Sequence, residues 1–507
     1  MNKPGRFISL FDKKYGLFYL IGGIVSLGIY LSVSSLYYRV GFPLDDAWIH
    51  QTYARNIAQG LGWTFMPGKT SGGSTSPLWT MLITLGYLFH IAPLIWNTFI
   101  GGLLLMGCIL VMRSYLLKYC PPGLSNGLAL LFLFEWHYVW AALSGMETML
   151  SIALVTFLFF WLETEGDRGW QWGLFLGICV WVRPDLITLI IPIAGKLFLS
   201  KGWKGLQKHS LLPIIKKGLG LMFILSLLGL SYFWFNRTTS GSWLTTTFYA
   251  KQAEYASLRT IPYWIRYFNL LSLSWVGVGA ILLPGFLVGI YQALRTSDWV
   301  TLAFAFWYFF YIGIYAMNLP VTYQHGRYVQ PAMAVFYLIG LKGAVLCWGV
   351  FSKPSKWAWI VNSAWKSSIV LVGMIFYCLG AVAYAKDVAF IESQMVDTAL
   401  WVKANVPSTT EIAVHDIGAM GYYGERDMVD LAGLINPSVI PFIRDEERLG
   451  EYLSQEEIEV LVCFPGWYPL LTAHRPILYQ GYNRFGQESG LGPLTVYHWS
   501  SDKILSP

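Results

Sequence analysis

Long apolar runs recur along most of the chain and leave only short polar stretches between them. The first run follows Lys13 and Lys14 and extends from Tyr15 to about Leu36. It has about the 20 residues that a helix needs to cross the hydrocarbon core of a bilayer, and no small-residue cleavage site follows it. Because the flanking charges are basic, the pattern predicts an uncleaved first transmembrane helix with its N-terminus in the cytoplasm.

Further apolar runs bring the prediction to about 11 transmembrane helices in all. The approximate cores of these further spans are 98–117, 124–142, 149–162, 170–182, 186–199, 211–235, 271–294, 300–318, 328–350 and 367–384. The runs at 149–162 and 170–182 are short for a membrane crossing.

One more apolar run, 77–91, is assigned by the positive-inside rule, by which basic residues concentrate in cytoplasmic loops. If 77–91 crossed the membrane, Arg113, Lys118 and the basic block 196–217 would face outward. If it lies along the outer interface, every basic loop faces the cytoplasm. We therefore expect the N-terminus inside and the C-terminus outside. The longer segments expected outside are 37–96, 236–270, 320–327 and the C-terminal tail.

Composition and charge agree with this topology. Hydrophobic residues are 55% of the chain and charged residues 12%, about half the roughly 25% usual in soluble domains. A soluble globular enzyme, a disordered protein and a fibrous repeat are therefore excluded. Residues 1–386 hold 28 basic and 11 acidic residues, whereas residues 387–507 hold 7 basic and 17 acidic ones. This division indicates two compartments and argues against a nucleic-acid partner.

The acidic tail, 387–507, predicts a small α/β domain outside the membrane. Its expected elements are helices at 395–405 and 445–453 and strands at 411–415, 460–464 and 495–499. It has no nucleophile elbow, phosphate-binding loop or metal motif. His415-Asp416 is a possible site, although Asp416 can also simply form a turn. We expect an accessory role for this domain, shaping the entrance for an acceptor.

Candidate chemistry lies in the first outer loop, 37–96, where Asp45 and Asp46 precede an amphipathic helix at 47–59 that carries Arg55 on its polar face. Of two adjacent carboxylates at a membrane surface, one can accept a proton from an attacking hydroxyl. The other can orient that hydroxyl or hold a cation. The alternative is that one of the pair only caps the following helix.

Motifs spread from residue 44 to about 435 resemble, in order, those of bacterial GT-C membrane glycosyltransferases. In the first outer loop they are 44–49 (LDDAWI), 53–56 (YARN), 60–62 (GLG) and 73–79 (GSTSPLW). Later ones are 144–148 (SGMET), 183–185 (RPD), 244–251 (LTTTFYAK), 326–328 with Pro331, 415–423 (HDIGAMGYY) and 429–434 (VDLAGL). They resemble above all those of the arabinofuranosyltransferase-like group of actinobacterial cell walls. They are also similar, more distantly, to those of protein O-mannosyltransferases and of aminoarabinose transferases of lipid A. In 244–251, Thr245 and Thr246 replace the Pro-Asn of that group.

The resemblance implies a GT-C helical membrane domain, 1–386, followed by an extracytoplasmic α/β accessory domain, 387–507. It also implies transfer of a sugar from a polyprenyl-phosphate donor to a glycan, lipid or protein acceptor at the outer face of a bacterial plasma membrane, with inversion. Asp45 would be the general base, with Asp46 as its partner or in the exchanged role. Lys251 and Arg327 would stabilise the departing phosphate. The remaining substrate-binding candidates are Arg55, Glu147, Arg183 and His325.

Each of the charged candidates also has a structural alternative. Lys251 can snorkel at the interface, Arg183 can pair with Asp185, Glu147 can cap a helix, and His325 can be an exposed loop residue. No cofactor is certain. If a divalent cation such as Mg²⁺ or Mn²⁺ is bound, its ligands would be Asp45, Asp46 and Glu147.

Two other classes of function remain open from the sequence. A lipid or sugar transporter or flippase would place polar or broken helices near the bilayer midplane. A non-catalytic membrane scaffold would leave Asp45 and Asp46 dispensable.

Overall fold

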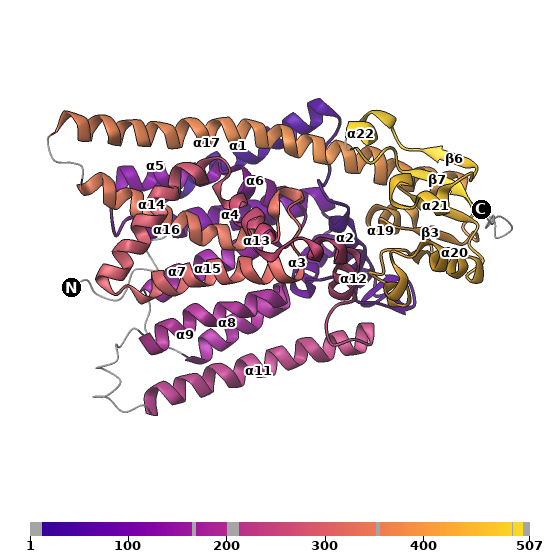
Figure 1. Ribbon diagram of the computed structural model, residues 1–507, viewed down its shortest axis with the longest axis horizontal. Helices are drawn as coiled ribbons and strands as arrows, with labels where there is room; N and C mark the ends of the chain where they lie inside the picture. Colours follow the sequence, from indigo (N-terminus) through magenta and orange to yellow (C-terminus); the bar gives the residue numbers. More distant parts are fainter. Residues whose placement is uncertain (1–12, 165–168, 200–211, 351–354, 489, 500–507) are drawn as a thin grey trace.

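The computed structural model describes residues 13–164, 169–199, 212–350, 355–488 and 490–499. Its long helices run along one axis, and a small domain with a β-sheet lies at one end of them (Figure 1). In this part of the chain, seven helices are long and apolar enough to cross a membrane. They are α1 (Lys13–Tyr37), α4 (Pro93–Leu116), α11 (Leu212–Ser240), α14 (Val278–Thr296), α15 (Trp299–Asn318), α16 (Gln330–Val350) and α17 (Lys356–Phe390). Each coincides with a predicted span, so the polytopic helical class is confirmed.

The other four predicted spans coincide with shorter helices, and a crossing at each of them stays a prediction. These helices are α5 (Pro122–Leu133) with α6 (Trp136–Leu143), α7 (Thr148–Thr164), α8 (Gly169–Val182), and the 3₁₀ helix η2 (Pro184–Leu189) with α9 (Ile190–Leu199). The span 124–142 is interrupted at Glu135, whose carboxylate accepts the Tyr138 N–H at 3.1 Å. Tyr337 donates its hydroxyl to the same carboxylate at 3.1 Å, so this polar break is satisfied inside the bundle.

Large apolar side chains cover the outer surface of the long helices. On α11, Phe223, Leu227 and Leu230 are 70%, 58% and 67% exposed. In water such a surface would be costly, whereas in lipid it is the preferred one. The exposed face of α11 therefore agrees with a helix that faces the hydrocarbon of a membrane.

The first outer loop folds into α2 (Asp45–Ala58), an antiparallel pair of short strands, and α3 (Pro77–Leu88). The strands are β1 (Thr64–Met66) and β2 (Lys69–Thr70). The 12 residues of α3 span roughly 18 Å, which is short of the roughly 30 Å hydrocarbon core. Its length therefore fits the predicted interfacial helix. Trp79 and Ile83 of α3 pack against Ala54 of α2, which ties the two helices together.

The second outer segment continues the same end of the bundle. It contains α12 (Thr246–Glu254), η3 (Ala256–Thr260), α13 (Tyr263–Ser272) and η4 (Leu273–Trp275). A third, short segment between α15 and α16 forms the 3₁₀ turn η5 (Gln324–Gly326).

The C-terminal domain begins without a break in the helix that leads into it. After α17 the chain passes through a π-helical turn, η6 (Ile391–Val396), into α18 (Asp397–Asn405). The predicted boundary between residues 386 and 387 therefore falls inside one continuous helical segment, Lys356–Asn405. Because a continuous helix is stiff, the C-terminal domain is fixed to the bundle through α17.

A five-stranded mixed sheet forms the centre of the C-terminal domain, in the order β4-β3-β5-β7-β6. The strands are β3 (Ile412–Val414), β4 (Val429–Asp430), β5 (Val460–Cys463), β6 (Ile477–Gln480) and β7 (Thr495–His498). Strand β3 pairs in parallel with β4 and β5, and β7 pairs antiparallel with β5 and β6. The expected strands at 411–415, 460–464 and 495–499 are confirmed. The two edge strands, β4 and β6, have no counterpart in the prediction.

Short helices surround the sheet. They are α19 (Ile417–Ala419), η7 (Met420–Gly424), η8 (Pro437–Phe442), α20 (Glu446–Gln455), η9 (Pro465–Trp467), α21 (Pro469–Thr472) and α22 (Asn483–Glu488). The helices expected at 395–405 and 445–453 correspond to α18 and α20, so the small α/β domain is confirmed.

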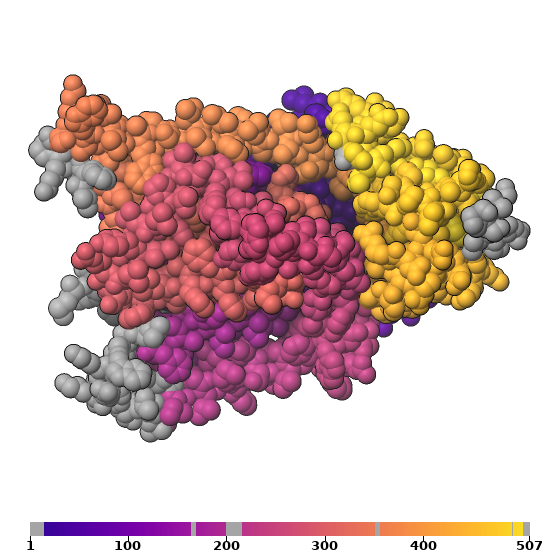
Figure 2. All heavy atoms as spheres, viewed as in Figure 1, coloured from indigo at the N-terminus to yellow at the C-terminus, as the bar shows by residue number. Residues whose placement is uncertain are grey.

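The domain packs directly on the first outer loop. Ile417 and Met420 belong to the same buried cluster as Phe42 and Trp48. Figure 2 shows the yellow domain closing one end of the helical part. One apolar core therefore continues from the bundle into the C-terminal domain, and the site described next lies where the two meet.

Candidate active site

Asp45 and Asp46 are the first two residues of α2, and neither of them is the helix cap. Leu44 occupies the N-cap position in an extended conformation, and no side chain caps the helix there. Both carboxylates still lie in the first turn, where the helix dipole favours negative charge. A capping role therefore does not explain the pair.

Asp46 lies in a cluster of two cations. Its Oδ2 accepts a hydrogen bond from Lys251 Nζ of α12 at 3.1 Å and another from Arg327 Nη2, directly after η5. The Tyr328 hydroxyl completes the cluster at 2.9 Å from Lys251 Nζ and 3.0 Å from Arg327 Nη2. Although burial opposes ionisation, the two cations hold the pKa of Asp46 well below its usual range. They also lower the pKa of the Tyr328 hydroxyl, again against the effect of burial.

Arg327 retains a free donor in this cluster. Its side chain is only 4% exposed, and among the described residues its Nη1 has no hydrogen-bond partner. A buried guanidinium N–H without an acceptor is costly, so the position favours a further negatively charged group.

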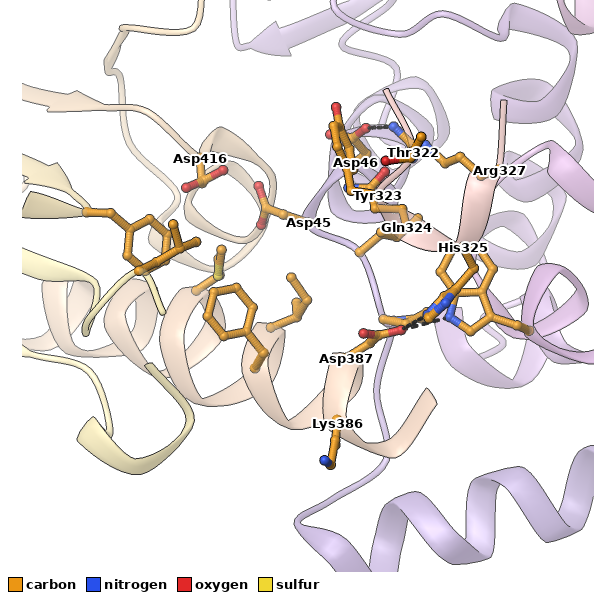
Figure 3. A pocket seen from close by; sticks show the side chains of 18 of the residues that line it. Asp45, Asp46, Thr322, Tyr323, Gln324, His325, Arg327, Lys386, Asp387 and Asp416 are labelled. Carbon is orange, nitrogen blue, oxygen red and sulfur yellow. Dashed lines mark hydrogen bonds and ion pairs between the residues drawn. The ribbon is translucent and has the colours of Figure 1, made fainter. Parts of the chain in front are cut away.

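Asp45 faces the opposite way, toward the C-terminal domain (Figure 3). Its carboxylate accepts the backbone N–H groups of Gly418 at 2.7 Å and Ala419 at 2.8 Å. Burial raises the pKa of Asp45 to about 6, even though these two amides lower it; the charge of Asp46 adds to the rise. The two adjacent aspartates therefore differ strongly in basicity.

Two cavities meet at the cation cluster. The larger has a volume of about 1210 Å³ and is lined by Asp45, Asp46 and Asp416 among others. The smaller has a volume of about 320 Å³ and is lined in part by Glu147, Arg183 and Tyr328. The residues that line both cavities are Asp46, Ile49, Lys251, Arg327 and Leu434. An anion bound by Lys251 and Arg327 would therefore be accessible from both sides.

Besides the residues shared by both cavities, two further predicted residues, Glu147 and Arg183, line the smaller cavity. Arg183 forms an ion pair with Asp185 at 3.0 Å and donates to the Tyr315 hydroxyl at 2.6 Å, so the structural alternative describes its contacts. Glu147 Oε2 lies 3.8 Å from His50 Nε2 and has no hydrogen-bond partner within the described chain. Burial lowers the pKa of His50, although Glu147 opposes this, so the imidazole is neutral near pH 7.

His325 lies in the wall of the larger cavity and is not a simple exposed loop residue. Its Nε2 is 2.7 Å from Asp387 Oδ2, and Asp387 also accepts Trp140 Nε1–H at 3.0 Å. The ring packs edge-on against Trp136 and Trp140. His325 and Gln324 both have a φ of 55°, a strained conformation for residues other than glycine. Backbone strain of this kind is typical of functional sites.

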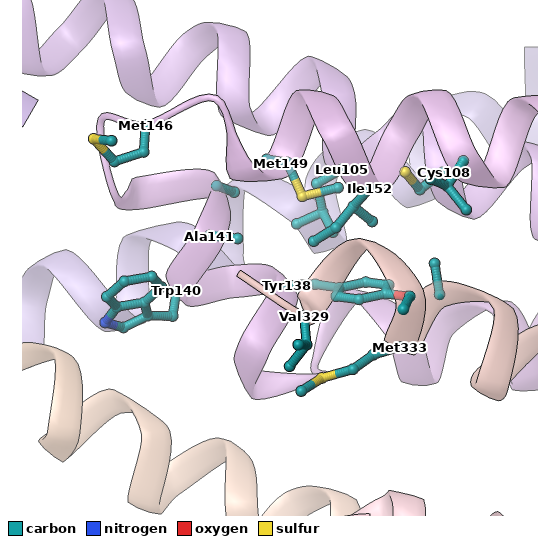
Figure 4. Packing of buried hydrophobic residues seen from close by; sticks show 14 of the residues in the cluster. Leu105, Cys108, Tyr138, Trp140, Ala141, Met146, Met149, Ile152, Val329 and Met333 are labelled. Atoms are coloured by element: carbon teal, nitrogen blue, oxygen red, sulfur yellow. The ribbon is translucent and has the colours of Figure 1, made fainter. Parts of the chain in front are cut away.

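Helix α6 under this wall is fixed by dense packing (Figure 4). Tyr138 and Ala141 of α6 belong to one buried cluster with residues of the neighbouring segments. Those labelled in Figure 4 are Leu105, Cys108, Met146, Met149, Ile152, Val329 and Met333. Because closely packed interiors resist deformation, Trp140 and the wall it belongs to are held rigidly.

Arg55 lies away from both cavities. Its guanidinium donates to the Tyr422 carbonyl at 2.6 Å and stacks over the Tyr422 ring. It therefore joins α2 to the C-terminal domain, and its expected role in substrate binding stays a prediction.

The metal ligands considered from the sequence do not come together. Asp45 accepts hydrogen bonds from backbone amides, and Asp46 is already paired with the side chains of Lys251 and Arg327. Glu147 lies beside His50. Within the described ranges, no group of three or more His, Cys, Asp or Glu side chains has the arrangement of a metal site. The proposed set of Asp45, Asp46 and Glu147 does not fit a divalent cation in this structure.

Several site residues escaped the sequence analysis. Gly418 and Ala419 lie within the motif 415–423, but nothing in that motif indicated that their backbone amides contact Asp45. Asp387 is the first acidic residue after the last long apolar run, and this position at the expected membrane surface could have indicated a site residue. His50 lies on the polar face of α2, and nothing in the sequence distinguished it as a site residue from the other polar residues of that face.

Comparison with solved structures identifies the fold. ArnT from Cupriavidus metallidurans, in the apo state, aligns with 98% of this chain and 99% of its own at a TM-score of 0.58 and 12% identity. Its structure bound to undecaprenyl phosphate aligns at 0.56 and 11%, over 98% and 100% of the two chains. The apo oligosaccharyltransferase of Archaeoglobus fulgidus aligns at 0.58 and 11%, over 89% of this chain and 70% of its own.

Sequence comparison adds little to this. Residues 378–498 match a family model described as a domain of unknown function (DUF8728). A search of curated proteins gives no match. The chain thus has the GT-C fold of membrane glycosyltransferases, as the resemblance in sequence predicted, and at these identities the similarity establishes the fold alone.

Proposed function

We propose that this protein is a membrane glycosyltransferase that moves a sugar from a polyprenyl-phosphate donor to an acceptor hydroxyl. The acceptor would be a glycan, lipid or protein of the cell envelope, at the outer face of a bacterial plasma membrane. One observation carries the proposal: Lys251 and Arg327 lie where two cavities meet, with a basic carboxylate, Asp45, in the wall of the larger one. Undecaprenyl phosphate in the similar ArnT structure is consistent with such a donor.

The cation cluster suits the departing phosphate. As the bond between the sugar and the phosphate breaks, the phosphate gains negative charge, which Lys251 and Arg327 would stabilise. Arg327 Nη1 is the free donor for this purpose, and Asp46 keeps both cations in place before the donor binds. Arg presents a planar fork and Lys a compact point charge, so the two complement each other on a phosphate.

Asp45 suits the role of base. With a pKa of about 6 it is ionised at neutral pH, yet it holds a proton more tightly than an ordinary aspartate. The acceptor oxygen would attack the anomeric carbon from the face opposite the phosphate, giving inversion. Its proton would pass to Asp45, and the sugar–phosphate bond would break to release the polyprenyl phosphate. Asp46 is too weak a base for this step because its cations stabilise the ionised form.

The proposed orientation of the protein in the membrane rests on the distribution of charged residues. The basic loops and the acidic C-terminal part would face opposite sides of the membrane, with the basic side in the cytoplasm. The site lies at the end of the bundle where the C-terminal domain is attached, which is the expected outer end. Glu147, His325 and Arg183 would contact the sugar or the phosphate from the cavity walls.

The test is sugar transfer in membranes of the host cell, which contain the acceptor, from a panel of radiolabelled polyprenyl-phosphate sugars. We expect Asp45→Asn to lose transfer about 10²–10⁴-fold, the contribution typical of a general base. Asp427→Asn is the matched control, because Asp427 lies in the same domain contact and pairs with Lys69 at the exposed surface. Full transfer by Asp45→Asn at equal expression would refute Asp45 as the base. If Asp46→Asn also transferred at the wild-type rate, the whole proposed site would be refuted.

A further inference from the structure

A short segment of the C-terminal domain, residues 416–419, reaches the Asp45 side of the site. Gly418 lies so close to α2 that a Cβ atom there would meet the Asp45 carbonyl oxygen at 2.0 Å. Side chains cannot occupy that space, so only glycine allows the two backbones to approach this closely. The close approach is what lets the Gly418 and Ala419 amides reach the Asp45 carboxylate.

The same segment brings a further carboxylate to the site. Asp416 stands just before α19, but its side chain does not cap that helix. It lines the larger cavity, and Figure 3 shows it turned toward Asp45. Its Oδ2 is buried and has no hydrogen-bond partner among the described residues. The turn-forming role that the sequence allowed leaves this oxygen unexplained.

We propose that Asp416 is a positioning residue for the transfer reaction, which forms a carboxyl pair with Asp45 and shares one proton with it. This rests on the proposed function and deepens it, because the C-terminal domain then supplies part of the acid–base machinery. Two carboxyl groups that face each other in a confined space cannot both ionise freely, so one proton stays between them. The shared proton also gives Asp416 the partner that it otherwise lacks.

The charges around Asp416 favour this arrangement. The acidic groups whose charges act on it are Asp45 and Asp46 of α2, Glu254 of α12 and Asp430 of β4. Two of them have cationic partners: Arg444 pairs with Glu254, and Lys251 and Arg327 pair with Asp46. Burial, followed by the charges of these carboxylates, raises the pKa of Asp416 well above its usual range. His415 does not compensate, because burial lowers its pKa to about 3 and leaves the imidazole neutral.

The proton balance of the transfer step is then complete. Before the step the pair carries one proton and one negative charge, and the donor is a singly charged phosphodiester. The acceptor oxygen forms the new bond to the anomeric carbon, and its proton joins the pair. The bond from the anomeric carbon to the phosphate oxygen breaks, and the polyprenyl phosphate leaves with one additional negative charge. The pair ends neutral, so the total charge is unchanged.

The first test is the pH dependence of transfer. In the wild type we expect kcat/KM to be constant above about pH 6 and to fall below it, because the pair must keep its negative charge to accept a proton. On this limb the pair passes between its singly charged and neutral forms. Asp416→Asn takes away the shared proton that stabilises the singly charged form, so the acidic limb should move to higher pH by about one unit. Asp427→Asn should leave the limb in place. An unmoved limb in Asp416→Asn would overturn the inference.

A second readout does not depend on activity. Infrared spectra of the detergent-solubilised full chain should contain the C=O band of a protonated carboxyl group at pH 7. We expect the difference spectrum between the wild type and Asp416→Asn to contain this band, and Asp427→Asn to keep the wild-type spectrum. In Asp45→Asn the band should remain but shift in frequency, because Asp416 keeps its proton and loses the partner that shares it. Coinciding spectra of the wild type and Asp416→Asn, or an unshifted band in Asp45→Asn, would refute the shared proton. If Asp45→Asn transfers normally, the proposed base fails as well. If Asp45→Asn loses transfer but Asp416→Asn changes neither the acidic limb of the pH profile nor the infrared carboxyl band, only the shared proton is refuted.

Discussion

The site has two sides, which begin at adjacent residues of one helix. On one side, Asp46 contacts side-chain cations, Lys251 and Arg327, that both come from the helical part of the molecule. On the other side, Asp45 contacts backbone amides of the C-terminal domain. Successive residues of an α-helix point about 100° apart, so one Asp-Asp pair can reach both parts.

The two sides differ in how strongly they stabilise the ionised form of their carboxyl group. Around Asp46 two full positive charges outweigh burial, and the carboxylate remains ionised. Around Asp45 two amide dipoles only partly offset burial, and the carboxyl group titrates near pH 6. Neighbouring carboxyl groups whose pKa values are driven apart are a mark of separate chemical roles. Under the proposed function, the Asp46 side organises charge and the Asp45 side takes part in proton transfer.

After the loss of Asp45 itself, the largest effect should come from removing a cation on the Asp46 side. Arg327→Met takes away the buried fork with its free Nη1, and we expect transfer to fall about 10²–10³-fold. Asp46 keeps Lys251 as a partner, so the chain should still fold. Transfer rates in membranes, with thermal unfolding as the check on folding, measure this. Arg259→Met is the control, since Arg259 is exposed and lines neither cavity. Equal transfer rates in the two variants would remove Arg327 from phosphate binding.

A smaller loss should follow when the Asp45 side is disturbed through the backbone. Gly418→Ala forces a methyl group against the Asp45 carbonyl, so the two chains must separate. We expect transfer to fall about 10- to 100-fold, the effect of displacing a catalytic group by about 1 Å. Overpacking should also lower the free energy of unfolding by about 1–3 kcal/mol. Both quantities are measured on the purified full chain.

Gly424→Ala, at the end of the adjoining helix η7, is the matched control. The nearest atom to its added Cβ would be the Met420 sulfur at 3.1 Å, the flexible part of a side chain that can move. We expect nearly wild-type transfer in this variant. If Gly418→Ala transfers equally well, the close contact between the two domains has no part in catalysis.

Much of this comparison was accessible from the sequence. Apolar runs predicted the long helices, because a membrane-crossing helix is marked by uninterrupted hydrophobicity over its full length. The Asp45-Asp46 pair, Lys251 and Arg327 were candidates from motif and charge, and the structure brings Asp46 together with both cations. Strands β3, β5 and β7 were visible as apolar segments because they are largely buried.

The Asp45 side was less accessible, for physical reasons. Its contacts join residues far apart in the sequence through backbone groups, and backbone amides carry no sequence signature. Arg55 looked like a polar residue free to bind substrate, yet its partners are carbonyl groups of the C-terminal domain. Strand β4 has only two residues and β6 is mostly exposed, so neither shows the pattern of a buried strand. The metal set grouped Asp45, Asp46 and Glu147 by chemistry alone and could not foresee their separate partners.

The smallest effect should come from a contact that joins the same two parts but lies in solvent. Lys69 of the first outer loop pairs with Asp427 of the C-terminal domain at 3.2 Å, and the two side chains are 63% and 51% exposed. Water and salt screen such a pair, so Asp427→Asn should change the free energy of unfolding by less than about 1 kcal/mol and leave transfer unaffected. Unfolding and transfer, measured at low and high salt, test this. A large loss of transfer in Asp427→Asn would mean that any loosening between the two parts stops the reaction. The effect of Gly418→Ala would then reflect general coupling between them, not the buried carboxylate at its centre.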